Sequence, residues 1–194
     1  LFIISTSAKA ASSPQIRITE IMYDPPGTAV REFIEIYNGS DTNADLSGWS
    51  MSGVTYNFPN GTILAPGQYA VIANDESILQ ADHPSLDILG EYSGDLEGSG
   101  ETIKILDQLG ETASEVTYGS SSPWPSSPYD GGPTLSLIRN SADESMVECW
   151  SESSTNGGTP GALNSVANNN QTGCLDKDYS QTIVVTPPQP EPQP

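Results

Sequence analysis

Short apolar segments rich in β-branched and aromatic residues alternate along this chain with clusters of glycine, proline, asparagine and serine. In residues 32–38, Ile34 and Ile36 fall on one face of an extended segment and Glu35 on the other, amphipathic face. Strands repeated about every eight to twelve residues are typical of a β-sandwich or barrel. The pattern predicts strands at residues 15–23, 32–38, 56–58, 63–64, 68–73, 87–92, 102–106, 115–118, 134–139 and 146–150.

Turn and cap residues complete this all-β prediction. Asn60-Gly61 predicts a hairpin between residues 56–58 and 63–64, because a type I′ turn needs positive φ at both central positions. Pro66-Gly67 suits a type II turn. The single predicted helix starts after the capping pair Asn74-Asp75 and ends before Pro84. We therefore expect an all-β fold with one short helix.

The two ends of the chain differ in composition from the middle. An apolar run followed by Ala8 and Ala10 predicts the end of a signal peptide, cleaved after Ala10, and the alternative is an apolar N-terminal strand. The last eight residues, P-P-Q-P-E-P-Q-P, are typical of an extended spacer. We divide the chain into a signal peptide remnant (1–10), a β-sandwich domain (15–165) and a polar, then Pro-rich, disordered linker or tail (166–194).

Charge and hydropathy narrow the classes of function. The chain has 25 Asp and Glu against 6 Lys and Arg, a formal charge of −19. Such a surface repels nucleic acid, whose binding depends on Lys and Arg. No further segment approaches the roughly 18 apolar residues of a membrane span, so the chain is not expected to be membrane-embedded. We expect a secreted or cell-surface protein.

Few side chains suit catalysis or tight metal binding. The one histidine, His83, precedes a proline at the expected helix end, where an exposed cap is a better interpretation than a catalytic base. The two cysteines, Cys149 and Cys174, do not have zinc-site spacing. After export they would form a disulfide, and two unpaired thiols are the alternative. We expect no enzymatic activity.

Six motifs follow one another along the chain. They are EIMYDP (20–25), EFIEIYN (32–38), DLSGW (45–49), LAPGQYAVIA (64–73), GSGETIKILD (98–107) and GTPGALN (158–164). In this order they resemble the lamin tail domain as it occurs in bacterial exported proteins. The resemblance implies an immunoglobulin-like β-sandwich without an active site, acting as a binding or tethering module of a larger secreted or surface protein. We expect a monomeric module whose partner is a protein or polysaccharide at the cell surface.

One aromatic pair could bind a ligand. Trp124 lies between two prolines, with Tyr129 nearby in a Ser/Pro-rich loop, and exposed rings of this kind stack on sugars or apolar partner surfaces. The alternative, packing of Trp124 against the sandwich edge, is the role of a W-P element in the resembled family. Trp49 is expected in the core. A carbohydrate-binding accessory module of a secreted enzyme is thus the second functional hypothesis.

Calcium is the one cofactor that the sequence leaves open. Asp95, Glu97 and Glu101 lie in a Gly-rich loop, and Ca²⁺ takes six to eight oxygen ligands. The alternative is a hairpin that carries solvated charge, because the ligand spacing is not that of an EF-hand. A second possible acidic cluster consists of Glu20, Asp24 and Glu32.

Overall fold

The computed structural model describes residues 14–167 and 172–179, and within them the chain forms short strands and very few helical turns. The strands are β1 (Ile16–Met22), β2 (Phe33–Asn38), β3 (Ala44–Asp45), β4 (Ser50–Ser52), β5 (Tyr56–Asn57), β6 (Ile63–Leu64), β7 (Tyr69–Ala73), β8 (Ile88–Glu91), β9 (Thr102–Leu106), β10 (Thr112–Thr117), β11 (Pro133–Leu137) and β12 (Trp150–Asn156). The helical segments are α1 (Glu76–Asp82) and the 3₁₀ turns η1 (Ala29–Arg31), η2 (Ser127–Asp130) and η3 (Val147–Cys149).

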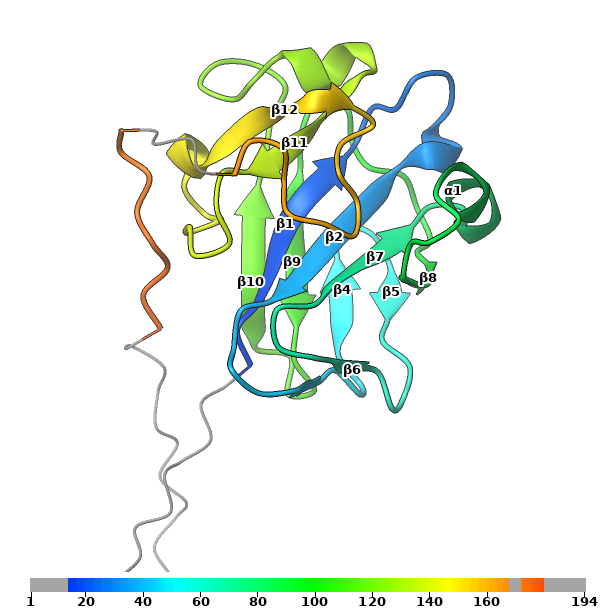
Figure 1. Cartoon of the computed structure of the whole chain (residues 1–194), viewed down its shortest axis with the longest axis vertical. Coiled ribbons are helices and arrows are strands. Elements are labelled where there is room, and N and C mark those ends of the chain that lie inside the picture. The colour runs from blue at the N-terminus through cyan, green and yellow to red at the C-terminus, as the bar shows by residue number, and fades with distance from the viewer. Residues whose placement is uncertain (1–13, 168–171, 180–194) are drawn as a thin grey trace, which may run out of the picture.

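The strands form two main sheets and a small ribbon. A six-stranded sheet has the order β12-β11-β1-β2-β7-β8, a four-stranded sheet has the order β10-β9-β4-β5, and β3 pairs with β6. Neighbouring strands run antiparallel except β7 and β8, which are parallel across the connection that contains α1. Figure 1 shows the six-stranded sheet lying over the four-stranded one, with α1 at the β7–β8 edge. The predicted all-β sandwich with one short helix is confirmed.

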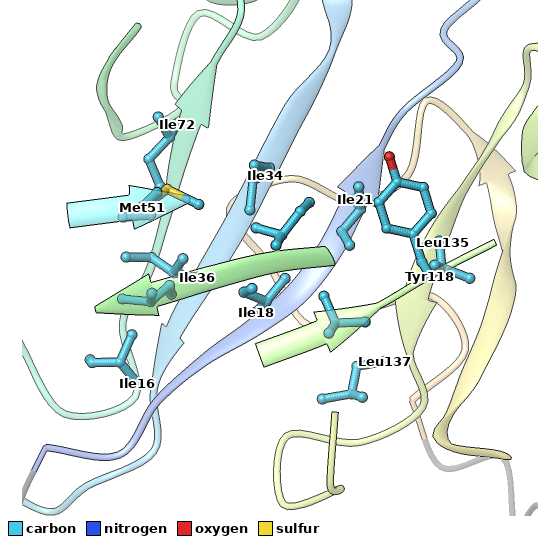
Figure 2. Packing of buried hydrophobic residues seen from close by; sticks show 14 of the residues in the cluster. Ile16, Ile18, Ile21, Ile34, Ile36, Met51, Ile72, Tyr118, Leu135 and Leu137 are labelled. Atoms are coloured by element: carbon cyan, nitrogen blue, oxygen red, sulfur yellow. The ribbon is translucent and has the colours of Figure 1, made fainter. Parts of the chain in front are cut away.

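The main core fills the space between the two sheets. Figure 2 shows the isoleucines of β1 and β2 pointing toward Met51 of β4 and toward the leucines of β11. Ile18, Ile36 and Leu135 have no exposed surface, and Trp49 is buried in the same cluster, as predicted. Each buried side chain of this size contributes about 1.5–3 kcal/mol to folding. The alternation in residues 32–38 therefore shows which face of β2 points into this core.

A second, smaller core covers the outer face of the six-stranded sheet. It consists of Met22, Phe33, Val71, Ala73 and Leu79. The first four come from the outward positions of β1, β2 and β7, and the last comes from α1. The amphipathic outer face predicted for β2 is thus where the only α-helix within the described residues packs.

Helix α1 begins and ends where its sequence predicts. The Asp75 carboxylate accepts a hydrogen bond from the Ile78 backbone N–H at 3.0 Å, which satisfies one of the unpaired donors at the helix start. The His83 N–H donates to the Leu79 carbonyl, and Pro84 follows immediately. A proline at that position cannot extend the helix without loss of a hydrogen bond.

Loss of this cap should be measurable. We expect Asp75→Ala to lower the free energy of unfolding by about 1 kcal/mol, because the Ile78 N–H loses its partner. For a domain of this size that corresponds to a fall of about 2–4 °C in melting temperature. Asp75→Asn keeps an acceptor oxygen, so its melting temperature should stay within about 1 °C of wild type. Equal destabilisation by both variants would show that the carboxylate charge, not the cap hydrogen bond, matters.

The hairpin predicted at Asn60-Gly61 does not form. The turn itself is present, with Gly61 at φ +85° and a 3.2 Å hydrogen bond from the Thr62 N–H to the Pro59 carbonyl. However, β5 pairs with β4, and β6 pairs with β3. Phe58 explains the difference: it is buried in the main core and its N–H donates to the Trp49 carbonyl, so the chain stays with β4 until the turn. The turn connects two pairings instead of closing one.

One further predicted turn is present in the structure, and one predicted strand is not. At Pro66-Gly67 the predicted turn is present: Gly67 has φ +73° and the Gln68 N–H donates to the Ala65 carbonyl. The strand expected at residues 146–150 is wrong, because η3 occupies this region and β12 begins only at Trp150. The Cys149 N–H donates to the Met146 carbonyl, which closes a turn that an extended strand cannot contain.

The folded region continues past the boundary predicted at residue 165. Residues 172–179, assigned above to the linker, pack against the domain through an isolated β-bridge between Ala142 and Asp176. Lys177 adds an ion pair with Asp143 at 3.0 Å. Charge and composition alone did not show these contacts. The predicted signal peptide remnant (1–10) and the Pro-rich residues 187–194 lie outside the described residues.

Candidate functional site

An open groove beside β12 contains the tryptophan that the sequence indicated. Its volume is about 410 Å³, and it is lined by Pro123, Trp124, Pro125, Val147, Glu148, Trp150, Ser151 and Glu152. The two indole rings lie 6.4 Å apart between centroids and are tilted by 51°. We call this set of residues the tryptophan groove. It combines a Pro-flanked loop with the start of an edge strand.

Local contacts fix both rings of the tryptophan groove. Trp150 is 2% exposed, and its indole N–H donates to the Glu144 carbonyl at 2.8 Å. Trp124 is partly buried against the main core, and its backbone N–H donates to the Ser121 carbonyl. A side chain at Gly119 would come within 3.1 Å of the Trp124 ring, so glycine at this position lets the ring approach the backbone. Trp124 therefore both packs on the sandwich edge and presents a surface to the groove.

The rim of the tryptophan groove carries negative charge that the domain does not neutralise. Glu148 and Glu152 are both exposed, and no basic side chain in residues 14–167 or 172–179 pairs with either. The five basic side chains in these ranges already have partners. These are Tyr179 for Arg17, Asp82 for Arg31, Glu115 for Lys104, Asp176 for Arg139, and Asp143 with Glu144 for Lys177.

Tyr129 lies outside the tryptophan groove. Its side chain is 49% exposed and does not line the groove. A Cβ atom at Gly98 would lie 3.4 Å from the Tyr129 ring, which places this ring over the loop before β9. Trp124 and Tyr129 therefore do not line the same groove. The residues that accompany Trp124 come from η3 and β12 instead.

The acidic loop proposed for calcium is held by internal hydrogen bonds. The Glu101 carboxylate accepts from the Glu97 N–H at 2.9 Å and from the Tyr118 hydroxyl at 3.2 Å, and Asp95 lies 3.4 Å from the Asn74 amide nitrogen. Within residues 14–167 and 172–179, no three Asp, Glu, His or Cys side chains are arranged to hold a metal ion. The three loop acids, and likewise Glu20, Asp24 and Glu32, do not form a metal centre in this structure.

Glu32 is a buried carboxyl group that also holds the acidic loop in place. One of its oxygens accepts from the Tyr92 hydroxyl at 3.0 Å and from the Leu96 N–H at 2.9 Å. Glu32 is 3% exposed, and burial raises its pKa from the ordinary 4.5 to about 7, although these hydrogen bonds oppose the shift. The group therefore changes charge near neutral pH while it holds the loop.

The pKa of Glu32 predicts how stability depends on pH. The folded state keeps the Glu32 carboxyl group protonated to higher pH than the unfolded chain does. The contribution of this group to the free energy of unfolding is therefore complete below about pH 4.5 and is lost as pH rises through 7. Glu32→Gln keeps an acceptor for Tyr92 and Leu96 but cannot ionise. At pH 8.5 the variant should be more stable than wild type by up to about 3 kcal/mol, and at pH 4 the two should be equal.

Thermal unfolding between pH 4 and pH 8.5 measures this difference. Glu111→Gln is the matched control, because it removes the same charge from an exposed position. The free energy of unfolding of this control should stay within about 0.5 kcal/mol of the wild-type value across the pH range. A plot of stability against pH for Glu32→Gln that runs parallel to the wild-type plot would contradict a raised pKa for Glu32.

Comparison with protein families gives the broader context of the domain. The sequence model of the Lamin Tail Domain family matches residues 9–120, which is more than half of the chain. The chain belongs to the lamin tail domain family. This family is one of non-enzymatic, immunoglobulin-like domains, in agreement with the sandwich described above. No curated protein matches the chain significantly.

In this lamin tail domain the tryptophan groove lies beyond the matched residues. Its residues fall between 123 and 152, whereas the family match ends at 120. The family match therefore does not cover the residues of the groove. In the described residues, no helix is both long and apolar enough to cross a membrane.

A second segment beyond the match is bound by two buried carboxylates of the lamin tail domain. Glu20 of β1 accepts from the Thr159 N–H at 3.0 Å, and Glu35 of β2 accepts from the Gly161 N–H at 2.7 Å. Burial raises the pKa of both groups, and the charge of Glu20 raises that of Glu35 further. Asn164 donates from its amide to the carbonyls of Thr19 and Leu137. The GTPGALN motif is thus a strap across the outer face of the sheet.

Cys149 and Cys174 form the predicted disulfide. Their Cα atoms lie 4.7 Å apart and both side chains are buried. The bond joins the end of η3 to residues 172–179, so it connects the wall of the tryptophan groove to the C-terminal segment. A Cβ at Gly173 would approach the Glu148 side chain to 3.3 Å, which shows how closely this segment lies to the rim.

Sequence reasoning missed the side chains that η3 and β12 contribute to the tryptophan groove, which are Val147, Glu148, Trp150, Ser151 and Glu152. The signal was limited to β12, in which residues at positions i and i+2 share one face. Trp150 and Glu152 are two positions apart in that strand, whereas Glu148 belongs to η3. What the sequence could not show is that the loop that contains Trp124 folds against η3 and β12.

Proposed function

We propose that this lamin tail domain is an exported, non-catalytic binding or tethering module of a larger secreted or cell-surface protein. The observation that carries the proposal is the disulfide between Cys149 and Cys174. Structural disulfides persist in oxidising compartments and are rare in the cytosol. The A-x-A sequence before the domain supports the same location.

The use of the buried acids supports a scaffold without a reactive centre. Glu20, Glu32 and Glu35 each accept hydrogen bonds from the backbone of a neighbouring loop. Buried carboxylates in this arrangement position loops, and each is already occupied by its donors. The tryptophan groove offers a partner two carboxylates that have no basic partner within the described residues, together with a partly exposed aromatic ring.

Location and thiol state together test this proposal. The protein that contains this chain is expressed in its native cell, the cell is fractionated, and the protein is treated with iodoacetamide before and after reduction. Recovery outside the cytoplasm, with Cys149 and Cys174 alkylated only after reduction, is the expected result. A cytosolic protein with two alkylated cysteines before reduction would overturn the proposal.

A carbohydrate-binding accessory module is the second candidate, and the accessible Trp124 ring favours it. Tryptophan faces stack on sugar rings, and open aromatic grooves accept extended chains. Affinity electrophoresis in gels that contain soluble polysaccharides tests this candidate directly. Retardation that disappears in a folded Trp124→Leu variant would support it, and equal migration in all gels would exclude the polysaccharides used.

A further inference from the structure

We propose that the tryptophan groove binds a cationic, extended segment of a partner protein, with an arginine or lysine stacked on Trp124 between the carboxylates of Glu148 and Glu152. This inference rests on the proposed binding function and names the chemistry of the partner. The ring geometry, the charge of the rim and the occupied donors of the neighbouring strand edge support it.

The aromatic part of the tryptophan groove suits a cation. Trp124 is fixed by Gly119 and by its contact with Trp150, so its ring is held in place before a ligand arrives. A guanidinium or ammonium over a tryptophan face is attracted by the ring quadrupole. Pro123 and Pro125 restrict the loop backbone on both sides of the ring, which lowers the entropy lost on binding.

The charge of the tryptophan groove is complementary to such a ligand. Glu148 and Glu152 have no basic partner within the described residues, and all five basic side chains there have other partners. A net formal charge of −19 extends the same attraction over the whole molecule. A cation in the groove therefore supplies the charge that the domain itself does not provide.

The polar groups of the tryptophan groove favour a cation over a sugar. Apart from the indoles, its polar side chains are the carboxylates of Glu148 and Glu152 and the hydroxyl of Ser151. Carboxylates only accept hydrogen bonds, whereas arginine and lysine only donate them. Sugar hydroxyls need donors as well as acceptors, and the groove offers few donors.

The backbone of β12 contributes little to recognition, so side chains must supply it. At this edge of the sheet the Trp150 N–H already donates to the Val147 carbonyl, and the Ser154 N–H donates to the Ser165 hydroxyl. A partner strand would find these donors occupied. The ligand is therefore recognised through the ring of Trp124 and the two carboxylates, not by addition of a strand.

Titration of the full chain with a capped hexa-arginine peptide, monitored by tryptophan fluorescence at 150 mM NaCl, tests this inference. A capped hexaserine peptide and cellohexaose serve as neutral probes. We expect saturable binding of hexa-arginine only. Glu148→Gln/Glu152→Gln should raise the Kd about tenfold, because two charge-assisted contacts are lost. Trp124→Leu keeps an apolar side chain, removes the aromatic face, and should raise the Kd about fivefold in calorimetry.

A matched pair of exposed acids separates the tryptophan groove from general charge. Glu97→Gln/Glu111→Gln removes the same two charges at positions outside the groove. Its Kd should stay within about twofold of wild type. Equal weakening by the two double variants, or no saturable binding of hexa-arginine, would overturn the inference.

The other outcomes are equally decisive. Saturable binding of cellohexaose that Trp124→Leu abolishes and Glu148→Gln/Glu152→Gln leaves unchanged would assign the tryptophan groove to sugars and reject a cationic partner. The proposed export of the domain is judged separately by its location and thiol state. A protein that is exported and oxidised but does not bind hexa-arginine would refute only this inference.

Discussion

Gly158→Ala should lower the free energy of unfolding of this domain by about 3 kcal/mol or more. A Cβ atom at this position would lie 2.5 Å from both the Glu20 carboxylate and the Thr134 side chain. Neither neighbour can move away freely, because Thr134 donates to Glu20 and both are buried in the sheet. The new methyl group therefore has to displace the strap or the carboxylate.

Displacement of Glu20 explains the size of the expected effect. Its carboxylate has no exposed surface and accepts from Thr134, Ser136 and the Thr159 N–H. A buried carboxylate that loses its donors costs several kcal/mol unless it takes up a proton. Chemical denaturation should show a lower midpoint with an unchanged m-value, and melting should occur about 6–12 °C lower.

Gly157→Ala is the matched control for Gly158→Ala. Gly157 has φ +80° and Gly158 has φ +70°, so alanine is strained to a similar degree at either position. Only the contacts differ, because a Cβ at Gly157 would meet no atom within 4 Å. We expect Gly157→Ala to cost about 1 kcal/mol. Equal losses in the two variants would mean that backbone strain, not the contact with Glu20, accounts for the glycine at 158.

The sequence predicted those parts of the fold that short-range patterns determine. In β2 and β9 the two isoleucines that enter the main core are two positions apart, and both strands were predicted to within one residue. The cap at Asp75 and the turn at Pro66-Gly67 are likewise set by local chemistry. These features depend on neighbours a few positions away, which a single sequence contains.

Pairing between distant segments was not predictable in the same way. The turn at Asn60-Gly61 was predicted correctly, but the strands that flank it pair elsewhere because Phe58 belongs to the main core. Trp124 was singled out, yet its neighbour Trp150 was expected in a strand and not beside a groove. Glu20 was considered for a metal, and its contact with Thr159, 139 residues later, could not be anticipated.

Removal of the disulfide by Cys149→Ala/Cys174→Ala should lower the free energy of unfolding by about 3.5 kcal/mol, the chain-entropy value for the loop of 25 residues that the bond closes. The remaining contacts of residues 172–179 are weaker. The ion pairs of Asp176 with Arg139 and Lys177 with Asp143 are partly exposed, and such pairs contribute about 0–1 kcal/mol each. Thermal unfolding with and without reductant measures the loss in wild type, and the double variant should not respond to reductant.

Arg139→Ala is the control for the double cysteine variant. It removes one surface ion pair and a hydrogen bond to the Cys174 carbonyl but leaves the disulfide, so its melting temperature should fall by no more than about 2–4 °C. Limited proteolysis adds an independent measurement, because residues 172–179 should become sensitive to protease in the double variant only. Unchanged stability and protection in that variant would show that the surface contacts hold the segment without the disulfide.

The effect of the disulfide should also depend on pH, because it holds Lys177 near a buried acid. Lys177 lies 3.6 Å from the Glu144 carboxylate, which has no exposed surface. Burial raises the pKa of Glu144, and the charge of Lys177 opposes that shift. If the segment leaves, the folded-state pKa of Glu144 rises further, and stability is lost as pH rises through it. The free energy of unfolding of the double variant should therefore lie further below that of wild type at pH 7.5 than at pH 5. An equal difference at the two pH values would show that the disulfide does not affect the ionisation of Glu144.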